Sequence, residues 1–308
     1  MDGRPIAAGA YAKPLGAAVE VAHARDDEAY RKRLITVFTS ITAENAMKWD
    51  RIEPEPGRFD FAEADELARF AKRTGKRLRG HPLVYDLQLP SWLTDRHWTA
   101  PELRAVLRRH IRTIVSRYRG RVAEWDVVNE PLADDGRFEP NLFHRVLGPG
   151  YVPFAFRVAH RADPHARLFL NEIDAERGPK STALFVLARG LVHQGVPIDA
   201  LGFQNHTTGR DAVEPRRLRQ LFRGARRLGL DAAITEMDVG GTEEGPQART
   251  YREAARACAH APNCTGLTVW GITDRFSWLT EGAHPLPFDG HGDPKPALDA
   301  LVRPLRRR

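Results

Sequence analysis

The chain has 308 residues, of which 42% are hydrophobic and 28% are charged, and its formal net charge is +7. This composition is ordinary for a soluble globular protein, and no apolar run is long enough to span a bilayer. Much of the positive charge is arginine in two stretches, 104–121 and 216–227, where it alternates with Leu, Val and Ile at helical spacing. That spacing predicts solvated helix faces rather than a nucleic-acid-binding surface.

Strand-like runs alternate with amphipathic helical stretches along the chain. Eight such units predict an α/β fold with a parallel sheet closed into a (β/α)8 TIM barrel. No glycine-rich dinucleotide fingerprint follows an early strand. We expect a single domain over 1–308, with the barrel proper at about 14–302. The predicted strands are 16–21, 34–42, 77–85, 122–130, 167–172, 200–206, 232–239 and 266–274.

Polar and aromatic residues gather at the C-terminal ends of these runs, which is where barrel enzymes build their active sites. A single polar residue at such a position is often no more than an ordinary loop residue. Here, however, every predicted strand after the first has at least one polar or aromatic residue at its C-terminal end. The set comprises Glu44, Asn45, Lys48, His81, Tyr85, Asn129, Glu130, Asn171, Gln204, His206, Glu236 and Trp270.

In two of the runs, 125–130 and 234–238, an apolar stretch with β-branched residues leads directly to a glutamate. These glutamates are Glu130 and Glu236. A single glutamate of this kind could cap a strand or pair with an arginine. Two at matching strand ends favour the carboxyl pair of a glycoside hydrolase, in which one protonates the leaving oxygen and the other attacks or stabilises the anomeric carbon. Asn129 adds a neutral group that could bind a sugar hydroxyl.

The chain resembles glycoside hydrolase family 10, the family of endo-1,4-β-xylanases, over nearly its full length. The resemblance is carried by long motifs that occur in the family's order. These motifs are TAENAMKW (42–49), GHPLV (80–84), QLPSW (88–92), WDVVNE (125–130), GFQNH (202–206), ITEMD (234–238) and WGITDRFSW (270–278).

The resemblance implies that Glu130 is the acid/base and Glu236 the nucleophile of a double displacement that retains the anomeric configuration. His206 with Asp238 behind it would orient the nucleophile and keep it charged. Xylan or a xylo-oligosaccharide would be the substrate, no metal or cofactor is implied, and we expect a monomer without nucleic-acid or membrane partners.

The family's sugar contacts also carry over. Asn129 and His81 match contacts to the sugar at the cleavage point, and tryptophans match the aromatic walls on the glycone side. The substrate-binding set is Glu44, Asn45, Lys48, His81, Tyr85, Gln88, Gln204, Trp270 and Trp278.

The chain departs from the family pattern near the cleavage point. Tyr85-Asp86 stands where the family usually has Trp-His, and Asn171-Glu172-Ile173 where it usually has Asn-Asp-Tyr. These changes leave both glutamates in place but keep a second hypothesis open, an enzyme redirected to a different β-glycoside. A catalytically silent carbohydrate-binding barrel is a third, and the presence of both glutamates argues against it.

Only two cysteines occur, Cys258 and Cys264, and they are close enough in sequence to form one small disulfide-bonded loop, which suits an oxidising compartment. The resemblance adds that many family members have a disulfide there, which supports export. The first ten residues are too short and too weakly apolar for a signal peptide, so the hypotheses are a secreted enzyme whose leader was removed and a cytoplasmic enzyme.

Overall fold

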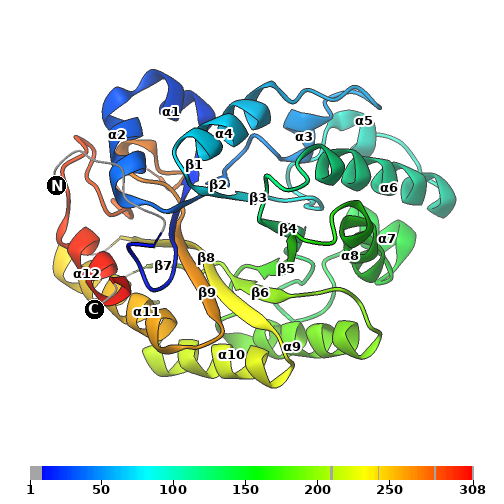
Figure 1. Ribbon diagram of the computed structural model, residues 1–308. Helices are drawn as coiled ribbons and strands as arrows, with labels where there is room; N and C mark the ends of the chain where they lie inside the picture. The colour runs from blue at the N-terminus through cyan, green and yellow to red at the C-terminus, as the bar shows by residue number, and fades with distance from the viewer. Residues whose placement is uncertain (1–8, 209–210, 242, 281, 307–308) are drawn as a thin grey trace.

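The strands form a closed parallel barrel surrounded by helices (Figure 1). The computed structural model describes residues 9–208, 211–241, 243–280 and 282–306. β1 pairs with both β2 and β9, and β6 pairs with both β5 and β8, which closes the ring. The predicted (β/α)8 barrel is therefore confirmed. The strands are β1 (Leu15–Val19), β2 (Ser40–Ala43), β3 (Arg77–Gly80), β4 (Glu124–Asn129), β5 (Arg167–Glu172), β6 (Ala200–Phe203), β7 (His206–Thr208), β8 (Asp231–Gly240) and β9 (Cys264–Val269).

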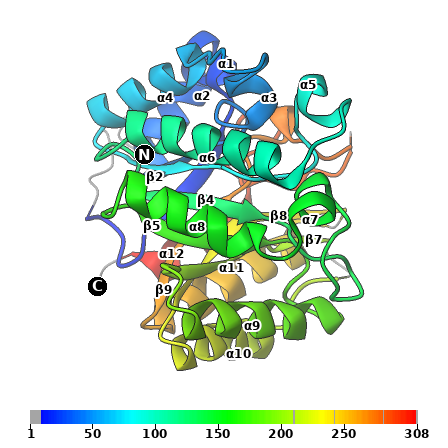
Figure 2. The same ribbon diagram turned by 90° about the vertical axis from the view of Figure 1, so that its right-hand side faces the viewer.

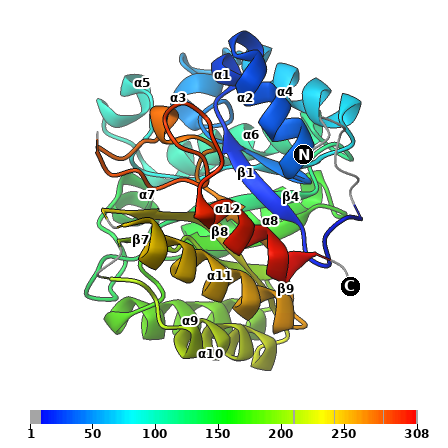
Figure 3. The same cartoon turned by 90° about the vertical axis from the view of Figure 1, so that its left-hand side faces the viewer.

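The helices pack their apolar faces on the outside of the strands, and α6 and α8 lie across β4 and β5 in Figure 2. α12 packs along α11, as Figure 3 shows. A 3₁₀ turn occupies Asp274–Phe276. The α-helices are α1 (Val21–Asp26), α2 (Glu28–Val37), α3 (Trp49–Ile52), α4 (Ala62–Arg73), α5 (Ser91–Thr94), α6 (Ala100–Arg117), α7 (Leu142–Leu147), α8 (Tyr151–Ala162), α9 (Gly178–His193), α10 (Pro215–Arg227), α11 (Glu244–His260) and α12 (Pro296–Leu305).

The two arginine-rich stretches are helix faces, as their spacing predicts. In α10, the buried residues Leu218, Leu221, Phe222 and Ala225 recur at intervals of three and four, which places them on one side of the helix. The arginines of α10 occupy most of the other positions. In α6 the helix start is fixed by the Glu102 side chain, which accepts a hydrogen bond from the Thr99 backbone N–H at 3.0 Å.

The second predicted strand is wrong in its first half. Within 34–42, the residues Leu34–Val37 form the end of α2, and β2 begins only at Ser40. The buried residues follow a helical rather than a strand spacing. Tyr30, Leu34 and Val37 are the buried residues of α2, and they lie four and three residues apart, on one side of a helix. An apolar run this short does not distinguish a helix end from a strand.

The predicted sixth strand is interrupted. β6 ends at Phe203, Asn205 adopts a left-handed conformation with φ 61°, and β7 resumes at His206 to pair with the C-terminal half of β8. This break lies at the end of the barrel that also holds α5 and α7 (Figures 2 and 3). The same end receives the loops that follow β3 and β4, so the predicted site residues share one face.

No helix within the described residues is both long enough and apolar enough to cross a bilayer.

Cys258, near the end of α11, is disulfide-bonded to Cys264 at the start of β9. The bond closes a loop with a sequence separation of 6, and both cysteines are buried. We expect the double variant Cys258→Ala/Cys264→Ala to lose about 2 kcal/mol of unfolding free energy, because the unfolded chain regains the freedom of that loop. Urea titration of purified proteins without reductant measures this.

The single variant Cys258→Ala is the matched control, since it already loses the crosslink and should unfold close to the double variant. A double variant with the unfolding free energy of the parent protein would contradict the assignment of this stabilisation to the disulfide.

Candidate active site

Glu236 lies in the middle of β8 and is 4% exposed. Its Oε1 accepts a hydrogen bond from Asn171 Nδ2 at 2.6 Å, and its Oε2 lies 3.4 Å from His206 Nε2. His81 Nδ1 lies 3.9 Å from Oε1. Both oxygens of this carboxylate therefore have a nitrogen of an amide or imidazole side chain close by.

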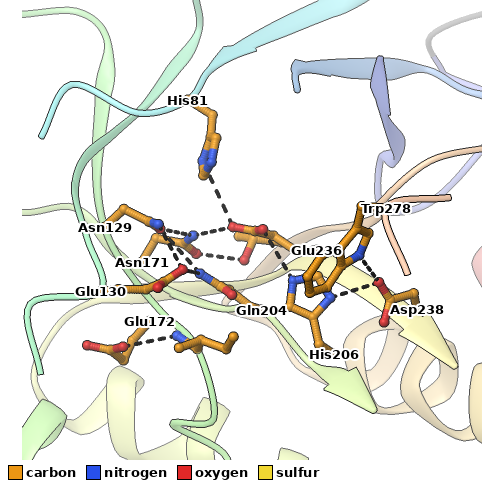
Figure 4. Close-up of polar contacts among 12 residues, drawn as sticks. His81, Asn129, Glu130, Asn171, Glu172, Gln204, His206, Glu236, Asp238 and Trp278 are labelled. Carbon is orange, nitrogen blue, oxygen red and sulfur yellow. Dashed lines mark hydrogen bonds and ion pairs between the residues drawn. The ribbon is translucent and has the colours of Figure 1, made fainter. Parts of the chain in front are cut away.

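His206 links Glu236 to a second carboxylate. Its Nδ1 is 2.8 Å from Asp238 Oδ2, and the same oxygen accepts a hydrogen bond from Trp278 Nε1 at 2.8 Å (Figure 4). Burial lowers the pKa of His206, but Asp238 and Glu236 outweigh that effect and raise the pKa to about 10. The imidazolium thus carries a proton on both nitrogens at neutral pH and can donate to both carboxylates.

Glu130 immediately follows β4 and has a left-handed backbone with φ 52°, which is uncommon for a residue other than glycine. Its Oε1 accepts hydrogen bonds from Gln204 Nε2 at 2.8 Å and from Asn129 Nδ2 at 3.0 Å. Burial raises the pKa of Glu130, and the charge of Glu236 raises it further, although the Gln204 hydrogen bond opposes them. This glutamate therefore keeps its proton to a higher pH than an exposed one.

Amide side chains fill the space between the two glutamates (Figure 4). Asn171 Nδ2 donates to Asn129 Oδ1 at 2.7 Å as well as to Glu236, and its own Oδ1 accepts from the Thr235 hydroxyl at 2.6 Å. Gly202 makes this arrangement possible, because a Cβ there would lie 2.1 Å from Asn171 Oδ1. The amides thus connect the carboxyl groups through neutral hydrogen bonds.

Charged side chains inside the barrel hold the His81 ring in place. Its Nδ1 is 2.9 Å from Asp126 Oδ2, and Arg79 Nε donates to the same oxygen at 3.1 Å. His81 follows Gly80, whose missing side chain leaves room for the ring of Trp125. All of these side chains except the glycine are buried, so the position of His81 is set by the barrel rather than by a loop.

The polar residues after β2 form a separate cluster. Lys48 Nζ donates to Asn45 Oδ1 at 3.0 Å, and Asn45 Nδ2 donates to Glu20 Oε2 at 2.8 Å. Burial and the charge of Glu20 raise the pKa of Glu44 to about 7. Burial lowers the pKa of Lys48, and Glu236 is the largest of the opposing effects. The cluster therefore lies within electrostatic reach of the nucleophile candidate.

Tyr85 lies in the loop after β3 and faces the glutamates. Burial raises the pKa of the Tyr85 phenol well above its usual range, and the charges of Glu130 and Glu236 raise it further. Asp86, which follows it, accepts a hydrogen bond from the Leu142 backbone N–H at 3.3 Å and so anchors the start of α7. Gln88 is half-buried and its backbone oxygen accepts from the Asp50 N–H at 3.2 Å.

Two tryptophans lie against the histidines. The Trp270 ring packs edge-on to His81 with centroids 5.0 Å apart, and the Trp278 ring packs edge-on to His206 at 5.0 Å. Trp278 is 53% exposed, which leaves much of its indole open to solvent. The predicted site residues thus lie at one face of the barrel, and among the described residues no group of three His, Cys, Asp or Glu side chains is placed to hold a metal ion.

Sequence reasoning assigned no role to several residues that bind predicted site residues or the loop that follows Glu130. Glu20, Asp126, Glu172 and Thr235 fall in this group, and Asn171 was recognised only as a polar strand end. The signal for Asp126 and Thr235 was their position on the strands that deliver the glutamates, because in a filled barrel polar side chains there need partners.

The match to known families extends over most of the chain. The model of glycosyl hydrolase family 10 matches residues 5–304. An endo-1,4-beta-xylanase of Agaricus bisporus is 39% identical over 277 residues, which cover 86% of this chain and 82% of that protein. Endo-1,4-beta-xylanase B of Thermotoga neapolitana is 37% identical over 288 residues, covering 90% of this chain and 83% of that protein.

Solved structures agree with the sequence matches. Native xylanase 10B from Thermotoga maritima superposes with a TM-score of 0.91 at 36% identity over 94% of both chains. An intracellular xylanase from Thermoanaerobacterium saccharolyticum superposes with a TM-score of 0.92 at 29% identity, covering 98% of this chain and 99% of that one. On the family match, the identities and the shared barrel, this chain belongs to glycosyl hydrolase family 10 and is a glycoside hydrolase.

Proposed function

We propose that this protein is a retaining endo-1,4-β-xylanase, with Glu236 as nucleophile and Glu130 as acid/base. The observation that carries the proposal is the pair of glutamates, Glu130 directly after β4 and Glu236 within β8, which have different surroundings and are connected by amide hydrogen bonds. Glu236 has a charged histidine beside it, whereas Glu130 has only neutral donors on its carboxyl group. Such a contrast suits one ionised and one protonated carboxyl group.

In the first step, an oxygen of Glu236 attacks the anomeric carbon and the bond to the leaving sugar breaks. Glu130 gives its proton to the departing oxygen, so a neutral alcohol leaves and a glycosyl ester forms on Glu236. The His206 imidazolium, 3.4 Å from Glu236, stabilises the carboxylate before it attacks, and Asp238 keeps the imidazolium in place. His206 and Asp238, which do not themselves react, therefore set the charge around the nucleophile.

In the second step, Glu130, now ionised, removes a proton from water, and the oxygen of that water attacks the anomeric carbon. The ester bond to Glu236 breaks and the sugar leaves with the configuration it had in the substrate. Formation of the ester removes the negative charge of Glu236, which had raised the pKa of Glu130. The pKa of Glu130 therefore falls once the ester has formed, so the carboxyl group that was the acid of the first step is ionised and available as the base of the second.

Xylan as substrate is supported by the relatives, which are named as endo-1,4-beta-xylanases. Glu44, Asn45, Lys48 and Gln88 supply donors and acceptors for sugar hydroxyls on the glycone side, with Trp270 and Trp278 as aromatic walls. Asn129, His81, Gln204 and Tyr85 serve the sugar at the cleavage point. Asp86 accepts a hydrogen bond from the backbone at the start of α7. The presence of Asp86 where the family usually has histidine therefore affects the loop that leads to α7.

We further propose that the catalytic unit is one barrel over about 14–302 and acts as a monomer. Export is supported by the disulfide, because such bonds persist in oxidising compartments. A cytoplasmic location is the second candidate, since one structural relative is described as intracellular. Counting free thiols in the protein purified from its native host distinguishes the two.

We expect Glu236→Ala to release no reducing sugar from soluble xylan, because no glycosyl ester can form. With an aryl β-xylobioside that carries a dinitrophenol leaving group, added azide should restore turnover by attacking the anomeric carbon directly, and NMR should identify the product as the inverted glycosyl azide. The control is Glu236→Gln, which keeps the shape of the side chain and should be equally inactive on xylan. Substantial xylan hydrolysis by Glu236→Ala would remove this residue from the mechanism.

We expect Glu130→Ala to lose activity in proportion to how much the leaving group needs a proton. The second-order rate constant kcat/KM should fall by about a hundredfold or more on phenyl β-xylobioside and little on the dinitrophenyl substrate. Because the raised pKa of Glu130 sets where the acid loses its proton, the alkaline fall of kcat/KM should also disappear in the variant. An equal loss with both substrates would argue against the acid role.

A further inference from the structure

The segment that carries Glu130 has few backbone hydrogen bonds available. Residue 131 is proline, so Glu130, Pro131 and Leu132 together have only two backbone N–H groups. The Glu130 N–H donates to the Asn171 backbone oxygen at 2.9 Å, and the Leu132 N–H donates to Glu172 Oε2 at 3.1 Å. Asn171 and Glu172, two consecutive residues at the end of β5, therefore accept the hydrogen bonds of both N–H groups.

These two contacts hold a strained conformation. Glu130 has φ 52°, and a left-handed backbone in a residue with a bulky side chain persists only where the surroundings enforce it. One anchor is a backbone oxygen, which no substitution removes, and the other is the side chain of Glu172. Loss of the Glu172 contact would leave the C-terminal side of the Glu130–Leu132 segment without its hydrogen bond to the barrel.

Glu172 is itself built into the fold and does not reach the substrate side of the site. It is 0% exposed, and Figure 4 places it on the far side of Glu130 from Glu236. Its Oε1 accepts the Ile173 N–H at 3.1 Å and lies 3.7 Å from the ammonium group of Lys180 in the first turn of α9. Its three described partners, the Leu132 and Ile173 N–H groups and the Lys180 ammonium, are all donors.

Lys180 extends the connection to the same loop. It is 5% exposed, and its ammonium group lies 3.1 Å from Asp134 Oδ1, two residues beyond Leu132. Glu172 thus has a buried cation as counter-ion, which offsets part of the cost of burying its charge. Burial and the charge of Glu130 raise the pKa of Glu172, whereas the Lys180 charge and the Leu132 and Ile173 N–H donors oppose that rise. These three partners hold the Glu172 side chain as a fixed acceptor in the barrel interior.

We propose that Glu172 is a positioning residue for the acid/base: by accepting the Leu132 N–H and binding Lys180, it fixes the segment from which Glu130 reaches the leaving oxygen. This inference rests on the proposed function of Glu130. Glu172 touches neither substrate nor the reacting atoms. Its removal therefore lowers the rate only where the reaction depends on well-placed proton donation.

The test is a series of aryl β-xylobiosides with phenols of different acidity, measured with Glu172→Gln. The amide keeps the size of the side chain but offers only one acceptor oxygen for two backbone donors, so the Leu132 or Ile173 contact is lost. We expect kcat/KM on the phenyl substrate to fall by about tenfold to a hundredfold, as for a reacting group displaced by about an ångström. On the dinitrophenyl substrate it should change by less than about twofold, since that leaving group needs no proton.

Two further variants make the result specific. Glu172→Asp keeps a carboxylate beside Lys180 and should recover most of the rate lost by Glu172→Gln on the phenyl substrate. Asp134→Asn breaks only the exposed end of the ion-pair chain and is the matched control, with kcat/KM close to that of the parent protein. The ratio of the two substrates is taken on one protein sample, so a partly unfolded preparation lowers both values equally and leaves the ratio unchanged.

A loss that is equal across the series, or a Glu172→Gln protein that matches the parent on the phenyl substrate, overturns the positioning role. Glu130→Ala measured in the same series separates this from failure of the proposed function. If Glu130→Ala shows the leaving-group dependence and Glu172→Gln does not, only the inference about Glu172 is wrong. If neither shows it, the acid role of Glu130 is wrong as well.

Discussion

The hydrogen bonds of the Asn171 amide determine how the two glutamates are placed relative to one another. Its nitrogen donates to Glu236 and to Asn129, and Asn129 in turn donates to Glu130. The direction of the amide is fixed because its oxygen accepts from the Thr235 hydroxyl. A reversed amide would direct an oxygen at the Glu236 carboxylate and leave Thr235 without this acceptor, so the barrel interior selects one orientation.

This arrangement follows from barrel geometry. β4 and β5 are neighbours, and the register sets Asn129 opposite Asn171, while β6 beside them contributes Gly202 opposite Asn171 on its other side. Only a glycine leaves room there for the asparagine side chain. Parallel strands with this register therefore place the Asn129 and Asn171 amides side by side, next to the space that Gly202 leaves free.

The electrostatic division between the glutamates has a separate origin. A histidine with a pKa of about 10 contributes a positive charge beside Glu236, and burial with neutral donors leaves Glu130 with a raised pKa. The histidine retains its charge because Asp238 lies behind it. One barrel face thus gives two chemically identical side chains different electrostatic surroundings.

The sequence was sufficient to predict the barrel, because strand periodicity is a local signal, and the polarity at the predicted strand ends marked residues that the fold gathers at one end of that barrel. It failed where a local signal was ambiguous, as at Leu34–Val37, whose apolar residues suit a helix end as well as a strand. It also gave no role to Glu172, because its contact with Leu132 joins the end of β5 to the loop after β4, 40 residues away in sequence. Partners of that kind are specified by register and burial, which appear only in the folded chain.

The central claim is that Glu236 attacks the sugar directly and that the product retains its configuration. Proton NMR of xylo-oligosaccharide cleavage by the unmodified protein tests it most directly, with spectra recorded before mutarotation equilibrates the new reducing end. Direct attack predicts that the β-anomer of the new reducing end appears first. First appearance of the α-anomer would mean that water attacks in a single displacement, and would contradict the assignment of Glu236 as nucleophile.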